Sequence, residues 1–328
     1  MNKDNISKNE YLDFVENQWK NYFLYKGYIQ EAPVKITSKS DSSVALIGST
    51  TNPLKKYLVN NTIGKEGRFI IQNCMRTQGL KKLKTNEPQM FGSYFKCMGI
   101  MTEYSQENLD KVVFEAFDYL TNKIEIPLDD IRIRINSQDR DLLNAIKQID
   151  KNIIREIDTF AEKYYRHKYG DNVGGIIGRN LNISIRKKGM DIFADIGNVI
   201  VMESDKKKHA VEMGFSNLVM SMTFFGADST VGSSRMADVY NIDSSEKMKF
   251  ADAMISTAVL QIEGISKEPQ CSHYFKRLLR QHYGSVINYW KDILKVTNNQ
   301  ILDYMEKFIV LEYKNLNFKG VNTWTVKK

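Results

Sequence analysis

The spacing of hydrophobic residues predicts a helix near the start of the chain. Leu12, Val15, Trp19, Phe23 and Leu24 follow helical spacing, as on one helical face, and Gly27 ends the pattern. A second helix is predicted over "ENLDKVVFEAFDYLTNKIEI", and from residue 244 onward the pattern is helical almost to the end. The chain is therefore expected to begin and end in helices.

Strands are predicted between these helices. "IRIRIN" alternates between apolar and polar residues, and "SSVALIGS", "RFIIQNCMR" and "GSYFKCMGIMTEY" each hold a short apolar run. The stretch from Asp141 to Lys168 is predicted to be helical. Because strands dominate roughly residues 66 to 235, we expect an α+β fold in which helices flank a mostly antiparallel sheet.

The composition is that of a globular protein with a sizeable core. The chain has 328 residues, of which 42% are hydrophobic, enough for one large domain and a smaller one. No apolar run approaches the ~20 residues of a membrane span, and the N-terminal residues are polar, so a soluble cytoplasmic protein is expected. The net charge of +8 favours polyanionic partners, although a Lys-rich composition also serves solubility alone.

Neither a zinc site nor a common nucleotide-binding loop is indicated by the spacing of residues. The three cysteines, Cys74, Cys97 and Cys271, lie far apart and form no zinc-binding pattern. No GxGxxG or GxxxxGK[ST] motif follows a predicted strand. A nucleotide would therefore have to bind on the surface of the sheet.

Several residues on the predicted strands are candidates for binding a ligand. Arg76 follows a strand, where an arginine can hold a phosphate through two hydrogen bonds. Tyr94 and Phe95 could stack on a purine, although aromatic residues in strands more often pack in the core. Asn198 stands between apolar neighbours, where a buried amide needs a hydrogen-bond partner or a ligand. Alternation along the predicted strand that contains it, "DIFADIGNVIVMES", places Asp195 and Gly197 on the opposite face.

The stretch "GADSTVGSSR" holds an anion, a small-residue bend and a cation close together. Asp228 could hold an ammonium group through charge-assisted hydrogen bonds. The bend at Gly232 would allow the backbone to approach a nucleotide closely, and Arg235 would lie beside its phosphates. The alternative is an ordinary loop with a capping Asp and an exposed arginine.

Taken in order, these stretches resemble the catalytic domain of alanyl-tRNA synthetases, a family of class II aminoacyl-tRNA synthetases. "QNCMR" and "SYFKCMG" are similar to the two strands of the family's motif 2, and "DSTVGSSR" is similar to motif 3. "DIGNVIVM" resembles the family's segment with the substrate-binding asparagine, and "KEPQCSHYFKRLLRQHYG" resembles the opening of its tRNA-binding helical domain. The resemblance implies a catalytic domain over residues 1–243 and a helical domain over residues 244–328.

The resemblance also implies an activity, which is ATP-dependent formation of an aminoacyl-adenylate with Mg²⁺ bridging the phosphates. Arg76 and Arg235 would be the catalytic residues that brace the phosphates, and Asp228 would hold the substrate ammonium group. The implied ATP-binding residues are Arg76, Tyr94, Phe95, Met98, Gly232 and Arg235, and the implied amino-acid-binding residues are Gly197, Asn198 and Asp228.

The chain departs from the family at several positions. Lys96 stands where the family has an acidic residue, and Ser234 stands where it has a glutamate. No tryptophan occurs between Trp19 and Trp290, so the amino-acid pocket would differ in shape and its substrate stays open. No HxxxH editing site is present and only about 80 residues follow the motif 3 resemblance, which suggests a truncated paralogue.

The acceptor of the activated amino acid is left open by the sequence. It could be tRNA, a carrier protein or a small amine, and the alternative is a degenerate paralogue that binds amino acid, nucleotide or a partner without ligase activity. By analogy with class II relatives, residues 10 to 26 could support a homodimer.

Overall fold

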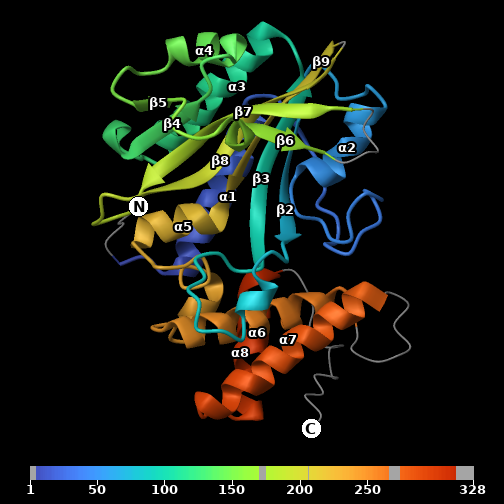
Figure 1. The fold of residues 1–328 in the computed structure, drawn as a ribbon, viewed down its shortest axis with the longest axis vertical. Coiled ribbons are helices and arrows are strands. Elements are labelled where there is room, and N and C mark those ends of the chain that lie inside the picture. The colour runs from blue at the N-terminus through green and yellow to red at the C-terminus, as the bar shows by residue number, and fades with distance from the viewer. Residues whose placement is uncertain (1–4, 170–174, 206, 266–273, 315–328) are drawn as a thin grey trace.

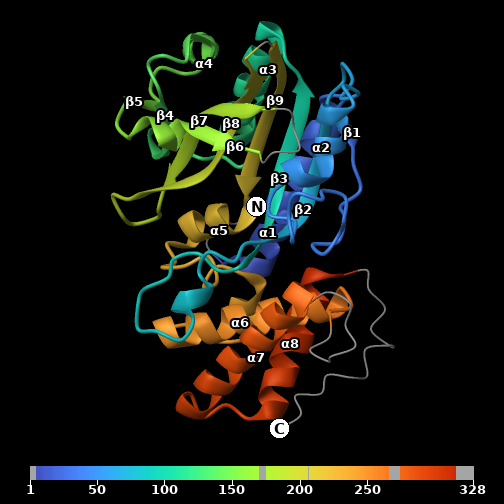
Figure 2. The same ribbon diagram turned by 45° about the vertical axis from the view of Figure 1, so that its right-hand side comes forward.

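The fold is built on one mixed β-sheet, shown in Figures 1 and 2. The computed structural model describes residues 5–169, 175–205, 207–265 and 274–314, so Cys271 lies outside the described residues. Within these residues, nine strands form a sheet in the order β1-β2-β3-β9-β8-β7-β4-β5, with β6 paired to β7. Only β1–β2 and β4–β5 pair in parallel among the described strands, so the predicted α+β fold is confirmed. The strands are β1 (Ile29–Gln30), β2 (Arg68–Met75), β3 (Tyr94–Glu103), β4 (Ile131–Ile135), β5 (Ile154–Ile157), β6 (Arg166–Lys168), β7 (Ile177–Arg186), β8 (Phe193–Ser204) and β9 (Lys207–Ser216).

Helices cover both faces of this sheet and its lower end. Helices α1 (Lys8–Tyr25) and α3 (Gln106–Asp118) pack on one face and form the main core with it, whereas α2 (Thr51–Val59) lies on the other face. Helices α6, α7 and α8 pack together beneath the sheet, in orange and red in Figure 1. The remaining helices are α4 (Arg140–Ala145), α5 (Asn217–Phe225), α6 (Ser245–Ile262), α7 (Tyr274–Ile293) and α8 (Asn298–Glu312).

The first helix matches its prediction. Ser7 caps α1 and forms a reciprocal capping box with Glu10, which satisfies backbone donors at the start of the helix. Of the five predicted apolar residues, Val15, Trp19 and Phe23 pack in the main core and Leu12 is also buried, whereas Leu24 is 46% exposed. Gly27 adopts a positive φ just after the helix ends. The hydrophobic spacing therefore identified both the helix and the face that it buries.

Alternation along the strands gives the sheet an apolar face and a partly polar face. In β9, Val211, Met213 and Phe215 enter the main core beneath α1 and α3. Glu212 and Gly214, the intervening residues, belong to the opposite face and line a cavity there. This polar face is where a ligand can reach the sheet.

A bulge in β8 changes which residues share a face. The register with β7 shifts so that Ser184 pairs with Asp195 while Ile183 pairs with Gly197. Ile196 therefore enters the main core and Asp195 turns to the polar face, where it accepts a hydrogen bond from Ser184 Oγ at 2.6 Å. The expectation that Asp195 and Gly197 share a face was wrong, because simple alternation does not account for the extra residue.

Two further local predictions were also wrong. "SSVALIGS" forms turns and not a strand, because Asn52 Oδ1 accepts hydrogen bonds from the backbone of Gly48 and Ser49 and holds the segment on the start of α2. Within Asp141–Lys168 the helix ends at Ala145, and β5 follows. This strand pairs with β4, and its Glu156 binds Arg132 and Arg134 of β4. Pairing between residues distant in the sequence therefore overrides the local helical spacing.

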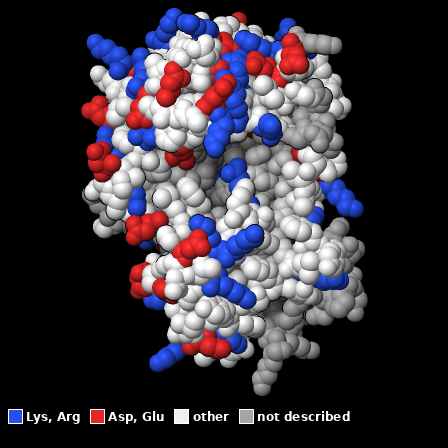
Figure 3. All heavy atoms as spheres, viewed as in Figure 1, with Lys and Arg blue, Asp and Glu red and all other residues white. Residues whose placement is uncertain are grey.

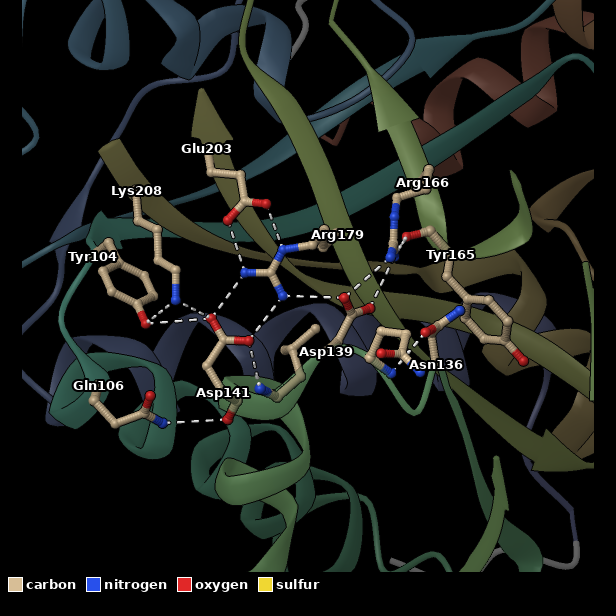
Figure 4. Close-up of polar contacts among 12 residues, drawn as sticks. Tyr104, Gln106, Asn136, Asp139, Asp141, Tyr165, Arg166, Arg179, Glu203 and Lys208 are labelled. Atoms are coloured by element: carbon tan, nitrogen blue, oxygen red, sulfur yellow. Dashed lines mark hydrogen bonds and ion pairs between the residues drawn. The ribbon is translucent and has the colours of Figure 1, made fainter. Parts of the chain in front are cut away.

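A network of ion pairs ties α4 to three strands of the sheet (Figure 4). Arg179 of β7 binds Asp141 at 2.8 Å, Glu203 at 2.6 Å and Asp139 at 3.2 Å. Lys208 of β9 also binds Asp141, at 2.6 Å. Burial would raise the pKa of Asp141, but hydrogen bonds and charges from Arg179 and Lys208 outweigh it and hold this pKa well below its ordinary value.

Replacing Asp141 with asparagine is expected to remove about 1–3 kcal/mol of unfolding free energy at pH 7, since hydrogen bonds to a charged group are lost. Because the folded pKa is depressed, the carboxylate stabilises the fold above its ordinary pKa and loses this effect as the pH falls through the folded value. The difference between the wild type and Asp141→Asn should therefore shrink below about pH 4. Urea unfolding from pH 7 to pH 3 measures this, with the exposed Asp292→Asn as control. A difference that stays constant with pH would contradict the prediction.

Candidate functional site

A cavity of about 830 Å³ opens on the polar face of the sheet. Its walls come from the segment before α2, the connection between β2 and β3, and β6, while β3, β7, β8 and β9 form its floor. Figure 3 shows this face of the molecule hollowed near its middle, with Lys and Arg atoms beside the hollow. The volume is within the range of sites that bind drug-sized or cofactor-sized molecules.

Asparagines and glycines lie side by side on the strands that form the floor of the cavity. Asn182, Asn198, Gly214 and Gly99 are paired in one row across β7, β8, β9 and β3. A Cβ atom added at Gly99 would collide with the side chain of Thr50, so the glycine permits the segment before α2 to approach the sheet. Asn182, Asn198 and Gly214 line the cavity, so the two amide side chains offer hydrogen-bonding groups to a ligand there.

Glu212 is a buried carboxylate beside this row. The hydroxyl groups of Thr50 and Thr51 both donate to its Oε1 atom, with the Thr50 contact at 3.5 Å. No Lys, Arg or His forms an ion pair with it among the residues that the structure describes. Burial raises the pKa of Glu212 to about 7, and the hydroxyl donors only partly oppose this. A cationic ligand would supply the missing charge partner.

Arg76 lies across the cavity's entrance from the end of β2. Its Nε donates to the carbonyl oxygen of Gly48 at 3.0 Å, and its guanidinium carbon lies 4.9 Å from the centre of the Phe95 ring. The described residues provide no carboxylate within ion-pairing distance of it. The remaining guanidinium donors are thus available to an anion.

His167 of β6 also lines the cavity. Its Nε2 lies 3.4 Å from Nδ2 of Asn198. Burial lowers the pKa of His167, and the charge of Arg76 lowers it further, so the ring is neutral at pH 7. The positive charges that line the cavity therefore come from Arg76, Lys168 and Lys55, of which Lys55 is paired with Asp41 at 3.1 Å.

The structure brings together four of the residues predicted from the sequence. Arg76, Phe95, Gly197 and Asn198 all line the cavity. Tyr94 is buried beneath the sheet and donates a hydrogen bond to Glu312 at 2.9 Å, so it does not reach the cavity. The side chains of Met98 and Val199 are buried in the main core on the other face. Of the two aromatic residues proposed for adenine, only Phe95 is placed to contact a ligand.

The expected convergence of Asp228 and Arg235 on this cavity is not found. Asp228 has a side chain that is 98% exposed and pairs with Lys187 at 3.1 Å. Arg235 is 2% exposed and pairs with acidic side chains of α1 and α8, while the amide of Gly232 donates to Ser229 Oγ at 3.0 Å. The cause is α5, which carries the chain off the sheet before this stretch begins. None of the three predicted residues lines the cavity.

Lys96 does not alter the cavity either. It is buried under the sheet, where its Nζ binds Glu16 at 2.9 Å and Glu312 at 2.7 Å. The cation at this position therefore belongs to a charge network on the far side of β3. A lysine replaces the acidic residue of the family at this position, and Glu16 and Glu312 neutralise its charge.

The main residue that the sequence reasoning missed is Glu212. Its signal was present, since a single acidic residue stands between Val211 and Met213 in an apolar run. Such a residue is either exposed on an amphipathic strand or buried for a function. The choice between these two required the position of α2 and its threonines, which local sequence does not provide.

Comparisons with known proteins find no family model that matches the chain. Among solved structures, it is similar to the RNA-binding domain of threonyl-tRNA synthetase from Cryptosporidium parvum Iowa II, with 8% identity, a TM-score of 0.44 and coverage of 66% of this chain and 64% of the other. It is also similar to aspartyl-tRNA synthetase from Entamoeba histolytica, with 9% identity, a TM-score of 0.41 and coverage of 68% and 56%. For asparaginyl-tRNA synthetase from Pyrococcus horikoshii complexed with asparaginyl-adenylate, the identity is 9%, the TM-score 0.38 and the coverage 68% and 66%. The chain thus spans less than two thirds of the length of the first two, and at these values we rest no assignment on the likeness.

The described residues provide neither a membrane-spanning helix nor a cluster of metal ligands. Among the helices in the described ranges, none is both long and apolar enough to cross a membrane. The described residues also contain no group of three or more His, Cys, Asp or Glu side chains that could hold a metal ion. A metal carried into the cavity by a nucleotide would take most of its ligands from phosphates and water, as Mg²⁺ commonly does.

Proposed function

We propose that the protein activates an amino acid with ATP, forming an aminoacyl-adenylate and pyrophosphate. The observation that carries this proposal is a buried carboxylate without an ion-pair partner, Glu212, in the same cavity as a guanidinium without one, Arg76. An amino acid's ammonium group and a nucleotide's phosphates match this pair of charges. The volume of about 830 Å³ is large enough for both substrates together. The resemblance of the β2 and β3 sequences to motif 2 supports the same function.

Four residues that line the cavity have roles in this proposal. Glu212 binds the ammonium group, a role that the sequence had assigned to Asp228, and Asn198 orients the amino acid. Arg76 binds the α-phosphate, and Phe95 stacks on the adenine. Mg²⁺ that accompanies the nucleotide would be held mainly by phosphate and water oxygens, and it would supply additional neutralisation of phosphate charge.

The reaction needs no nucleophile from the protein. The carboxylate oxygen of the amino acid attacks the α-phosphorus of ATP, and the bond from that phosphorus to pyrophosphate breaks. Holding the two substrates side by side lowers the barrier because the encounter becomes intramolecular, and Arg76 stabilises the charge that grows on the phosphate. The aminoacyl group would then pass to tRNA, a carrier protein or a small amine.

A second candidate function is binding of amino acid or nucleotide without catalysis. The burial of Arg235 favours it, since the cavity then offers only one arginine to the phosphates from the residues that line it. The homodimer through residues 10–26 and the division at residue 243 both stay predictions for either function.

The deciding experiment is amino-acid-dependent ATP–pyrophosphate exchange with each of the twenty amino acids, combined with equilibrium ATP binding. We expect exchange with at least one amino acid, and Arg76→Met should lower its rate about a hundredfold, as loss of a charge-stabilising donor does. Arg140→Met, which removes an exposed arginine at the start of α4, is the matched control. ATP binding without exchange would support the second candidate. Failure to bind ATP would reject amino-acid activation, and failure to bind either ATP or any of the amino acids would reject both.

A further inference from the structure

The end of α8 is fastened to the underside of the sheet by one buried carboxylate. Glu312, the last residue of α8, accepts a hydrogen bond from the Tyr94 hydroxyl at 2.9 Å. The same carboxylate binds Lys96 Nζ at 2.7 Å and Arg235 Nε at 3.1 Å. Its side chain is only 6% exposed, so these three partners replace nearly all of its hydration.

Two of these partners flank the residue proposed to contact adenine. Tyr94 and Lys96 are the neighbours of Phe95 at the start of β3. Because side chains alternate along a strand, Phe95 faces the cavity while its two neighbours face α8. Glu312 therefore contacts β3 on the face opposite the cavity, at the two residues on either side of Phe95.

Tyr313, the residue after Glu312, makes a second contact, with β2. The amide Nδ2 of Asn73 donates to the Tyr313 hydroxyl at 3.4 Å, and Asn73 is the strand partner of Lys96. Arg76 follows this part of β2 and lies over the Phe95 ring. The two cavity residues thus share a support that comes from the C-terminal helical region.

The charges around Glu312 keep it ionised. Burial alone would raise its pKa, but Lys96 and Arg235 outweigh this and keep the pKa below its ordinary value. From α1, Glu16 shares both cations and Asp13 also binds Arg235 at 3.0 Å. Removing the charge of Glu312 would leave these cations with fewer anions in a buried site.

We propose that Glu312 is a positioning residue for the cavity, and that it couples the docking of the helical region α6–α8 to nucleotide binding. This inference rests on the proposed function for its ligand, ATP. Arg235 then contributes to the site from a distance, because it supports Glu312 and does not touch the phosphates. A strand end such as Tyr94–Phe95 opens readily unless its side chains are held, and Glu312 holds the residues on both sides of Phe95.

The test compares Glu312→Gln with Asp303→Asn, which removes a carboxylate from an exposed ion pair with Lys307 on the same helix. We expect Glu312→Gln to weaken ATP binding about tenfold, a typical coupling between two sites, and to leave kcat of the exchange reaction much less affected. Asp303→Asn should leave ATP binding unchanged. Hydrogen exchange of the unliganded protein should become faster over residues 93–97 in Glu312→Gln only.

Combination with Arg76→Met separates positioning from a general loss of stability. If Glu312 acts through Arg76 and Phe95, adding Glu312→Gln to Arg76→Met should weaken ATP binding by clearly less than the tenfold effect of Glu312→Gln alone, whereas independent effects would multiply. Unchanged hydrogen exchange at residues 93–97, or unchanged ATP affinity despite faster exchange, would overturn the inference. If the wild type does not bind ATP, the proposed function fails, and hydrogen exchange still decides whether Glu312 supports β3.

Discussion

Exchanging Glu212 for glutamine is expected to raise the amino-acid KM in pyrophosphate exchange roughly tenfold to a hundredfold. The reason is the loss of charge from a buried group that binds an ammonium ion, since a hydrogen bond to a charged group contributes about 1.5–3 kcal/mol. Glutamine keeps the shape of the side chain and can still accept from Thr50 and Thr51. The unfolding free energy should therefore change little while the KM changes greatly.

The dependence on pH gives an independent test of the same residue. Since burial raises the pKa of Glu212 to about 7, the carboxylate becomes charged as the pH rises through that value. In the wild type, the amino-acid KM should fall over this range because the charged form binds the ammonium group. The KM of Glu212→Gln should lack this pH dependence.

A matched control is Glu107→Gln, which alters an exposed glutamate in the first turn of α3. It should leave both the KM and its pH dependence unchanged. Should Asp228→Asn raise the KM while Glu212→Gln does not, the ammonium group binds at the exposed carboxylate and the role given to Glu212 is wrong. Equilibrium binding of the amino acid, measured at pH 6 and pH 8, would detect the same difference without turnover.

Replacing Arg235 with methionine is expected to lower the free energy of unfolding by about 3–5 kcal/mol, because it removes one partner from a buried group of ion pairs. Arg235 is 2% exposed and binds Glu16 and Glu312, each at 3.1 Å. These carboxylates would keep only Lys96 as a shared cation. Urea unfolding of the unliganded protein measures the effect.

The conservative variant Arg235→Lys tests the same prediction if Arg235→Met does not fold. It keeps the charge but cannot reach Asp13, Glu16 and Glu312 together, so an intermediate loss of stability is expected. Arg140→Met, at an exposed arginine, should change stability by less than about 0.5 kcal/mol. Full stability of Arg235→Met together with lost ATP binding would instead return Arg235 to the direct phosphate-binding role that its sequence context suggested.

Much of the fold follows from local pattern. The helical spacing of α1 and the apolar runs of β2 and β3 located these elements, because burial of one face imposes a period on the residues that form it. These runs and the stretch around Asn198 directed attention to Arg76, Phe95 and Asn198, since polar or aromatic residues within strands must face either the core or a ligand. All three line the cavity.

The sequence alone could not show where segments meet that are distant along the chain. The route of α5 off the sheet decided that Asp228 is exposed and Arg235 is buried. Packing of the segment before α2 against Gly99 decided that Glu212 is a buried carboxylate at a cavity floor. By itself, then, the sequence determined the periodic elements and the residue types available for chemistry. Only the tertiary structure decided which of them share a site, because burial and charge pairing depend on contacts that local spacing does not encode.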